Sequence, residues 1–303
     1  MRWTARDIPD LKGRTSVVTG ANSGLGYVTA RELARRGARV VLACRSQRRG
    51  DAAFNRLLDE VPEARAELRL LDLADLASVR AFAAAWGDTP LHLLVNNAGL
   101  MAVPRATTAD GFESQFGVNH LGHFALTGLL LPALRAARGA RVVTVSSFLH
   151  LLGNIDIHDL NARRDYRRWL AYGRSKTANL LFTHELARRA AALDLLAAAV
   201  HPGYADTQLQ LQAARLERSA VKERIARAGN RLLAAPPEAG AMPTLYAATA
   251  PGVTADSFTG PGTLRGRAGH ALRAPWTVND AIARRLWLAS EELTGVHYAG
   301  LPA

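Results

Sequence analysis

Short apolar segments rich in valine and leucine alternate along the chain with longer segments of mixed polarity and helical periodicity. The apolar segments predict strands at residues 16–19, 39–43, 67–71, 91–96, 141–146 and 195–201. The segments between them predict helices at residues 24–36, 48–60, 76–86, 112–138 and 170–192. Apolar strands in strict alternation with helices are typical of a parallel sheet covered on both faces. The predicted fold class is therefore α/β, a doubly wound parallel sheet in a single domain over residues 1–303.

Two segments interrupt this alternation. Residues 148–169 separate the fifth strand from the next helix, and residues 208–237 follow the last strand and predict one or two amphipathic helices. Both follow the carboxyl end of a strand, and ligands of such sheets bind at that edge. We expect residues 208–237 to form a substrate-binding lid or, alternatively, a packed pair of surface helices.

The composition is that of an ordinary globular protein, because 49% of the 303 residues are hydrophobic and 21% are charged. We expect no membrane span, because no apolar segment has the necessary length. We expect no signal peptide, because the N-terminal charges are followed by no apolar core. The single cysteine, Cys44, excludes an internal disulfide and indicates a reducing compartment, so the predicted location is cytoplasmic.

The net charge of +12 comes almost entirely from arginine. Nucleic acid is not an expected partner, because these arginines are scattered over the predicted helices and form no single stripe with interleaved aromatic residues. An acidic substrate or a phosphorylated cofactor agrees better with the charge.

A glycine cluster follows the first predicted strand and opens the first helix. Gly20 allows a tight turn, Gly24 allows a pyrophosphate to approach the backbone, and Gly26 allows the helix to pack closely on the strand. The helix N-terminus would then offer free N–H groups to phosphates. The predicted phosphate-binding residues are Gly20, Asn22, Ser23, Gly24, Leu25 and Gly26. A simple strand–helix turn is the alternative, since the spacing is not G-x-G-x-x-G.

The ends of the second and third strands carry the residues that would select the cofactor. The second strand is followed by Arg45 and no carboxylate, which favours the 2′-phosphate of NADP(H) over the free ribose of NAD(H). A solvated loop arginine is the alternative. Asp72 and Leu73 follow the third strand, where the Asp72 carboxylate could accept a hydrogen bond from an adenine amine or cap the next helix.

Tyr172 and Lys176 are four residues apart in a predicted helix, so their side chains share one face. A fixed cation nearby would lower the pKa of a phenol, which is otherwise near 10. Such a pair can move a proton on or off a hydroxyl group. The alternative is a core tyrosine with a hydrogen-bonded hydroxyl. Tyr166 is not a second candidate, because Leu170 stands four residues after it.

Several motifs in order resemble the short-chain dehydrogenase/reductases, a family with a Rossmann-type fold. The resemblance covers residues 10–207 and implies that they form the cofactor-binding and catalytic core. These are Thr19-Gly20-x-x-x-Gly24-Leu25-Gly26, Asn96-Asn97-Ala98-Gly99, Asn119, Ser146, Tyr172-x-x-x-Lys176 and Pro202-Gly203. The long separation of Ser146 from Tyr172 and the segments at 116–124 and 284–287 look like the retinol dehydrogenase and protochlorophyllide reductase-like branch. That branch is mostly NADP-dependent, in agreement with Arg45.

The resemblance implies a role for each matching residue. Tyr172 would be the general acid and base, Lys176 would lower its pKa and bind the nicotinamide ribose, and Ser146 would hydrogen-bond the substrate oxygen. Asn119 would hold a local helix distortion and a water that links Lys176 to solvent. The resemblance also places Asn96, Ala98 and Gly99 at the nicotinamide ribose and Pro202 and Thr207 at the carboxamide.

The predicted function is NADP(H)-dependent interconversion of an apolar aldehyde or ketone and its alcohol, with NAD(H) as a possible second cofactor. Leu149, Leu151 and Leu152 could line the substrate pocket. A C=C reductase of the same family and a nonenzymatic NADP-binding sensor are the alternatives. The resemblance also implies a homodimer or homotetramer paired through the helices at 112–138 and 170–192. We expect no metal site, because His120 and His123 share a predicted helix face without a third ligand.

Overall fold

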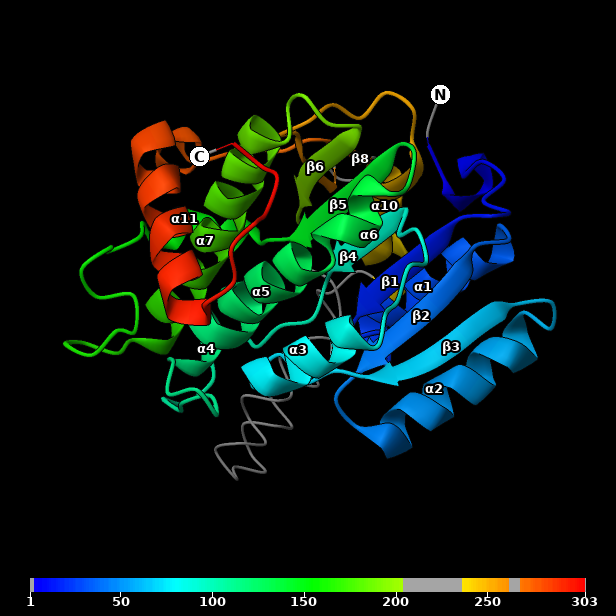
Figure 1. Ribbon diagram of the computed structural model, residues 1–303, viewed down its shortest axis with the longest axis horizontal. Coiled ribbons are helices and arrows are strands. Elements are labelled where there is room, and N and C mark those ends of the chain that lie inside the picture. Colours follow the sequence, from blue (N-terminus) through cyan, green and yellow to red (C-terminus); the bar gives the residue numbers. More distant parts are fainter. Residues whose placement is uncertain (1–2, 204–235, 262–267, 303) are drawn as a thin grey trace.

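Eight strands form one sheet in the part of the chain that the computed structural model describes, residues 3–203, 236–261 and 268–302 (Figure 1). In chain order they are β1 Thr15–Thr19, β2 Arg39–Cys44, β3 Arg65–Leu70, β4 Leu93–Asn96, β5 Ala140–Val145, β6 Leu195–Val200, β7 Phe258–Pro261 and β8 Ala268–His270. Only the β7–β8 pair is antiparallel. The doubly wound α/β prediction and its six strands are confirmed, whereas β7 and β8 were not predicted.

The strands lie in the order β3-β2-β1-β4-β5-β6-β7-β8, so the chain reverses its direction across the sheet between β1 and β4. Consecutive strands first add on one side of β1, and the later strands add on its other side. At such a reversal, the loops after the two neighbouring strands diverge and leave a crevice for a ligand. The crevice expected here lies beyond Thr19, at the end of β1, and Asn96, at the end of β4.

Helices cover both faces of the sheet (Figure 1). One layer consists of α1 Gly24–Arg35, α2 Gln47–Glu60 and α10 Pro237–Thr249, and the other of α3 Leu76–Ala84, α5 Gly122–Leu129, α6 Leu131–Arg135 and α7 Arg168–Arg189. Successive strand residues pack against opposite layers. Val17 packs against the layer that contains α7, and Val18 packs against the layer that contains α1. Of the helices in the described ranges, none is long and apolar enough to cross a membrane.

The shorter helices are η1 Ala5–Asp7, α4 Ser114–Phe116, η2 Gly117–Leu121, η3 Phe148–Leu152 and η4 Pro275–Val278. All are 3-10 helices except α4, which is an α-helix, and η2, which is a turn of π-helix. The prediction of one continuous helix over 112–138 is therefore wrong. The π-turn contains Asn119, and Pro132 near the start of α6 lacks the N–H that an uninterrupted helix would need.

The last helix, α11 Asp280–Thr294, packs on α7 and reaches α5 (Figure 1). Trp287 of α11 is buried, with its ring centroid 5.1 Å from that of Phe124 and 5.9 Å from that of Phe182. The ring of Tyr298 completes the cluster, 4.4 Å from Trp287. The helices that the resemblance assigns to subunit pairing are thus partly covered by α11 of the same chain. A homodimer or homotetramer stays a prediction.

We predict that Trp287→Ala lowers the free energy of unfolding by about 3–5 kcal/mol, because it opens a cavity among three aromatic rings. Leu288→Ala is the matched control, since that neighbouring side chain is 54% exposed and its loss should cost less than about 1 kcal/mol. Urea denaturation followed by circular dichroism measures both values. Equal losses in the two variants would contradict the packing of α11 described above.

Candidate active site

Helix α7 brings Tyr172 and Lys176 together at the carboxyl end of β5. Both side chains are buried, with 6% and 4% of their surfaces exposed. The Lys176 ammonium group donates a hydrogen bond to the carbonyl oxygen of Val145 at 3.0 Å, and its nitrogen lies 5.7 Å from the centre of the Tyr172 ring. The two residues therefore share one helix face, and the lysine is fixed by the last residue of the strand.

Burial determines the protonation of both groups. It raises the pKa of Tyr172 to about 12, against a smaller lowering effect of a hydrogen bond from Ser147. It lowers the pKa of Lys176 to about 8. The direction of the Tyr172 shift is opposite to the lowering expected from Lys176, because desolvation of a phenolate is the largest cause of the shift. At neutral pH Tyr172 is a phenol, which can donate a proton, and Lys176 is mostly an ammonium ion.

Two adjacent serines follow β5, and they face different partners. The Ser146 hydroxyl donates to the backbone carbonyl of Lys176 at 2.8 Å, which ties the strand to α7. The Ser147 side chain is the one that lies beside the Tyr172 phenol, where it acts to lower the pKa of that group. The role expected of Ser146 at the substrate oxygen stays a prediction, and Ser147 is a second candidate for it. Adjacent extended residues point in opposite directions, so only one of the two serines can face Tyr172.

Asn119 connects the π-turn to the segment after β4. Its side-chain oxygen accepts from the N–H of Leu100 at 2.7 Å, and its nitrogen donates to the carbonyl of Leu100 and to the Ser175 hydroxyl, both at 2.9 Å. A Cβ atom added to Gly99 would lie 3.0 Å from the Asn119 oxygen and 3.5 Å from the Lys176 nitrogen. Asn119, Gly99 and Lys176 therefore lie close together. The water that the resemblance places at Asn119, linking Lys176 to solvent, stays a prediction.

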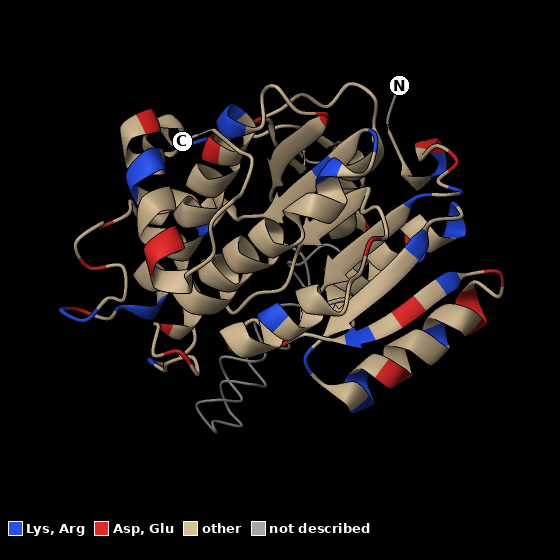
Figure 2. Cartoon of the chain, in the orientation of Figure 1, with Lys and Arg blue, Asp and Glu red and all other residues tan. Residues whose placement is uncertain are grey.

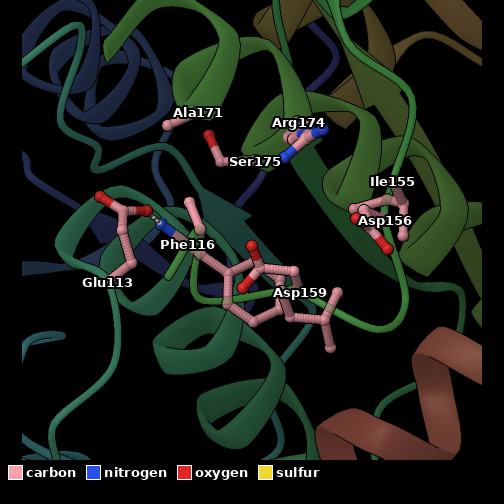
Figure 3. Close-up of a pocket in the computed structure, with 10 residues that line it drawn as sticks. Glu113, Phe116, Ile155, Asp156, Asp159, Ala171, Arg174 and Ser175 are labelled. Atoms are coloured by element: carbon pink, nitrogen blue, oxygen red, sulfur yellow. Dashed lines mark hydrogen bonds between the residues drawn. The ribbon is translucent and has the colours of Figure 1, made fainter. Parts of the chain in front are cut away.

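A small cavity of about 10 Å³ lies between α4, α7 and residues 155–162 (Figure 3). Glu113, Arg174 and Ser175 are among the side chains around it. Its volume suits one water molecule and is too small for an organic substrate. The Ser175 hydroxyl at its edge also donates to the carbonyl oxygen of Tyr172 at 2.7 Å. The cavity therefore adjoins the catalytic helix and is not the substrate pocket.

The glycine cluster forms the turn between β1 and α1. Gly20 has a φ of +67°, and a Cβ atom on Gly26 would lie 2.5 Å from the Gly20 carbonyl oxygen, so both positions require glycine. Helix α1 begins at Gly24, and Ser23 in front of it makes no side-chain capping bond. The first N–H groups of the helix therefore remain available to a diphosphate. Of the other two predicted residues, Leu25 is buried and Asn22 is partly exposed.

Arg45 follows the last residue of β2 and is exposed. The thiol of the preceding Cys44 accepts backbone hydrogen bonds from Ala21 and Asn22, and burial raises its pKa to about 11. These bonds hold the end of β2 against the glycine turn. An exposed guanidinium beside that turn fits the 2′-phosphate of a bound NADP(H).

The residues after β3 are held in a turn. The Asp72 carboxylate accepts from the N–H of Ala74 at 2.9 Å, while Asp75 caps α3. Leu73 is buried, and a Cβ atom on Gly122 would lie 2.5 Å from its carbonyl oxygen. Of the two alternatives for Asp72, capping of the next helix is therefore wrong, because Asp75 has that position. The adenine contact stays a prediction.

The segment after β4 contributes to the site mainly through its backbone. The Asn96 side chain points inward, is buried and donates to the Thr127 hydroxyl at 3.1 Å, so it is not directed at a cofactor. Ala98 and Gly99 are partly exposed, as is Pro202 after β6. Thr207 lies outside the described residues, and so does the predicted lid, except for its last two residues.

Sequence reasoning missed the part played by Thr19 and His123. The Thr19 hydroxyl oxygen accepts from the N–H groups of Asn97 and Ala98, both at 2.9 Å, and lies 2.9 Å from the Nε2 atom of His123. The Nε2 atom of His120 instead lies 2.8 Å from the Ser290 hydroxyl on α11, so the two histidines do not share one face. Thr19 is the last residue of an apolar strand. The hydrophobic pattern of that strand does not indicate which residues the Thr19 hydroxyl contacts.

Tyr166 has hydrogen-bond partners other than Tyr172 and Lys176. Its hydroxyl donates to the carbonyl oxygen of Val103 at 2.8 Å and receives a hydrogen bond from Gln115. Burial raises its pKa to about 12. Among the residues in the described ranges, no group of three or more His, Cys, Asp or Glu side chains could hold a metal ion.

Comparison with known proteins gives relatives along almost the whole chain. Retinol dehydrogenase 12 from Mus musculus is 51% identical over 195 residues, which cover 64% of this chain and 62% of that protein. Retinol dehydrogenase 12 from Homo sapiens is 41% identical over 294 residues, covering 95% of this chain and 88% of that protein.

Two solved structures are also similar. An uncharacterised protein from Mycobacterium paratuberculosis is 47% identical, has a TM-score of 0.81 and matches 98% of this chain and 99% of its own. A candidate NAD(P)-dependent gluconate 5-dehydrogenase from Beutenbergia cavernae, solved with bound NADP, is 29% identical, has a TM-score of 0.58 and matches 79% of this chain and 91% of its own.

The sequence profile of the short chain dehydrogenases matches residues 14–217, which include the glycine turn and the Tyr172–Lys176 pair. This match and the retinol dehydrogenase relatives confirm the resemblance derived from the motifs. The chain belongs to the short-chain dehydrogenase/reductase family and is an oxidoreductase of that family acting on CH–OH groups.

Proposed function

We propose that the protein interconverts an apolar aldehyde or ketone and its alcohol, with NADP(H) as the preferred cofactor and Tyr172 as the proton donor and acceptor. The observation that carries the proposal is the buried Tyr172 phenol, which lies beside Ser147 and has the Lys176 ammonium nitrogen 5.7 Å from its ring centre. Lys176 adjoins Gly99 in the segment after β4, and Ala98 of that segment adjoins Gly20 of the glycine turn, so a dinucleotide bound along them would bring its nicotinamide to the pair.

In the reductive direction, a bound NADPH would supply a hydride to the carbonyl carbon of the substrate. The Ser147 hydroxyl would donate a hydrogen bond to the substrate oxygen, on which negative charge develops. Tyr172 would transfer its proton to that oxygen, which completes the alcohol and leaves a phenolate. The Lys176 cation would stabilise this phenolate until it regains a proton from solvent. The oxidative direction reverses each of these transfers.

An apolar substrate is favoured by the segment that directly follows Ser147. Helix η3 exposes Phe148, Leu151 and Leu152 at 42%, 40% and 56% of their surfaces, an unusual concentration of large apolar side chains. Leu149 is partly exposed beside them. The relatives named retinol dehydrogenases agree with an apolar alcohol or aldehyde. Lys and Arg side chains are spread over many elements, which supports a small-molecule substrate over a nucleic acid (Figure 2).

The cofactor preference rests on the end of β2. Arg45 is exposed there, and no carboxylate follows the strand that would repel a 2′-phosphate. Bound NADP in the 29% identical Beutenbergia cavernae protein supports the same cofactor. NAD(H) is then the weaker alternative, since it would leave the Arg45 guanidinium without a phosphate partner.

We predict that Tyr172→Phe lowers kcat for reduction of a lipophilic aldehyde by roughly 10²–10⁴-fold, because the phenol proton is lost. The assay follows oxidation of NADPH by its absorbance. Tyr166→Phe removes a hydroxyl that is bonded to Val103 instead and should keep kcat within about threefold of the wild type. Equal rates in the two variants would refute the assignment of Tyr172.

We predict that Ser147→Ala lowers kcat by roughly 10²–10³-fold, the usual effect of removing a donor from an oxyanion site. Ser146→Ala is the matched control. It removes a bond to the Lys176 carbonyl, so it should lower the free energy of unfolding by about 1 kcal/mol and leave most of the activity. Steady-state kinetics and urea denaturation distinguish the two serines, and the reverse pattern would restore the original assignment of Ser146.

We predict that Arg45→Ser lowers kcat/KM with NADPH by roughly 10–100-fold and leaves kcat/KM with NADH within about twofold, because a charged hydrogen bond to the 2′-phosphate is lost. Arg65→Ser makes the same charge change at the start of β3, at the opposite end of the strands, and should alter neither value. Equal losses with both cofactors would argue against a 2′-phosphate at Arg45.

A further inference from the structure

His123 lies in the first turn of α5 and is 1% exposed. Its Nδ1 atom lies 3.1 Å from the backbone carbonyl oxygen of Asn119, and its Nε2 atom lies 2.9 Å from the Thr19 hydroxyl oxygen. One buried ring thus bridges the π-turn of the catalytic asparagine and the strand end that leads into the glycine turn.

The hydrogen-bond partners determine which ring nitrogen of His123 carries the proton. A carbonyl oxygen only accepts, so Nδ1 must donate to Asn119, and Nε2 of a neutral ring is then an acceptor. The Thr19 oxygen already accepts from two backbone N–H groups, and its one proton has two acceptors within reach, Nε2 of His123 at 2.9 Å and the carbonyl oxygen of Val95 at 3.3 Å. The shorter distance favours donation to Nε2. Burial lowers the pKa of His123 to about 4, so the ring is neutral at neutral pH and the arrangement is complete.

These hydrogen bonds hold the segment at residues 97–100 at both of its ends. Thr19 holds the start of the segment through the N–H groups of Asn97 and Ala98. Asn119 holds its end through both the N–H and the carbonyl of Leu100. His123 joins the two residues that hold these ends, so the distance between them depends on its imidazole ring.

We propose that His123 is a positioning residue that fixes the segment 97–100 in the conformation that binds the nicotinamide half of the cofactor. The inference rests on the proposed NADP(H) site. Gly99 in the middle of this segment faces Lys176, since its added Cβ would lie 3.5 Å from the ammonium nitrogen. Loss of the bridge lets Thr19 and Asn119 move apart, and the segment between them then no longer matches the cofactor.

The test is the dissociation constant of NADPH, measured by fluorescence titration of the full chain without substrate. His123→Phe keeps a buried ring and removes both bonds, and it should raise the dissociation constant by roughly tenfold. His120→Phe is the matched control, because His120 lies three residues away, is 2% exposed and bonds to Ser290 on α11. It should leave the dissociation constant within about twofold, even if both variants lose stability.

Two further variants keep one bond each and carry the test if His123→Phe does not fold. The amide of His123→Asn takes the place of Nδ1 and keeps the bond to Asn119, and that of His123→Gln takes the place of Nε2 and keeps the bond to Thr19. Both should raise the dissociation constant by roughly threefold. The proposed role of His123 is wrong if His123→Asn and His123→Gln both bind NADPH as tightly as the wild type. It is also wrong if His123→Phe and His120→Phe bind NADPH equally well. Failure of the wild type to bind NADPH overturns the proposed function instead.

Discussion

The buried ammonium group of Lys176 is the constraint on which the geometry of the site depends. A charged group with 4% of its surface exposed is stable only if its hydrogen bonds are satisfied, and the carbonyl oxygen of Val145 is its partner. That oxygen also accepts from the Asn179 side chain at 3.1 Å, and Ser146 bonds back to the Lys176 carbonyl. Strand β5 and helix α7 are therefore joined by three hydrogen bonds around one charge, and Tyr172 is placed by the same helix.

The same burial sets the chemistry of the pair. Desolvation keeps Tyr172 protonated and makes Lys176 an easier proton donor than a lysine in water, with pKa values of about 12 and about 8. These shifts leave a phenol and an ammonium ion at neutral pH. The spacing alone suggested a lower phenol pKa, but spacing carries no information on burial, and desolvation is the largest cause of the Tyr172 shift.

Much of the architecture could be predicted because it depends on periodicity. Apolar strands alternating with amphipathic helices allow few arrangements other than a doubly wound sheet, and the glycines at 20 and 26 reflect close backbone contacts. Strands β7 and β8 escaped prediction because they have four and three residues, too few for a pattern. The resemblance implied a helix distortion at Asn119, and the π-turn lies there. Periodicity alone gave no sign of this break at 112–138, because it depends on tertiary bonds of Asn119.

The candidate site was predictable down to residue type but not to every residue. Ser146 and Ser147 are the same residue type and differ in the direction in which their side chains point, which the sequence does not reveal. Thr19 and His123 have ordinary positions in a strand and a helix, and their contacts join segments about one hundred residues apart, as the separation of 104 between them shows. Such contacts depend on how the chain folds, so the sequence pattern alone does not predict them.

Hydride transfer to a carbonyl carbon is the central claim, and isotope transfer tests it most directly. The protein would be incubated with NADPH carrying deuterium at both hydrogens of nicotinamide C4 and with an apolar enone, which offers a carbonyl and a C=C bond in one molecule. Mass spectrometry and nuclear magnetic resonance then locate the label. The account predicts one deuterium on the carbinol carbon of an allylic alcohol. Deuterium on the former alkene carbon of a saturated ketone would contradict it.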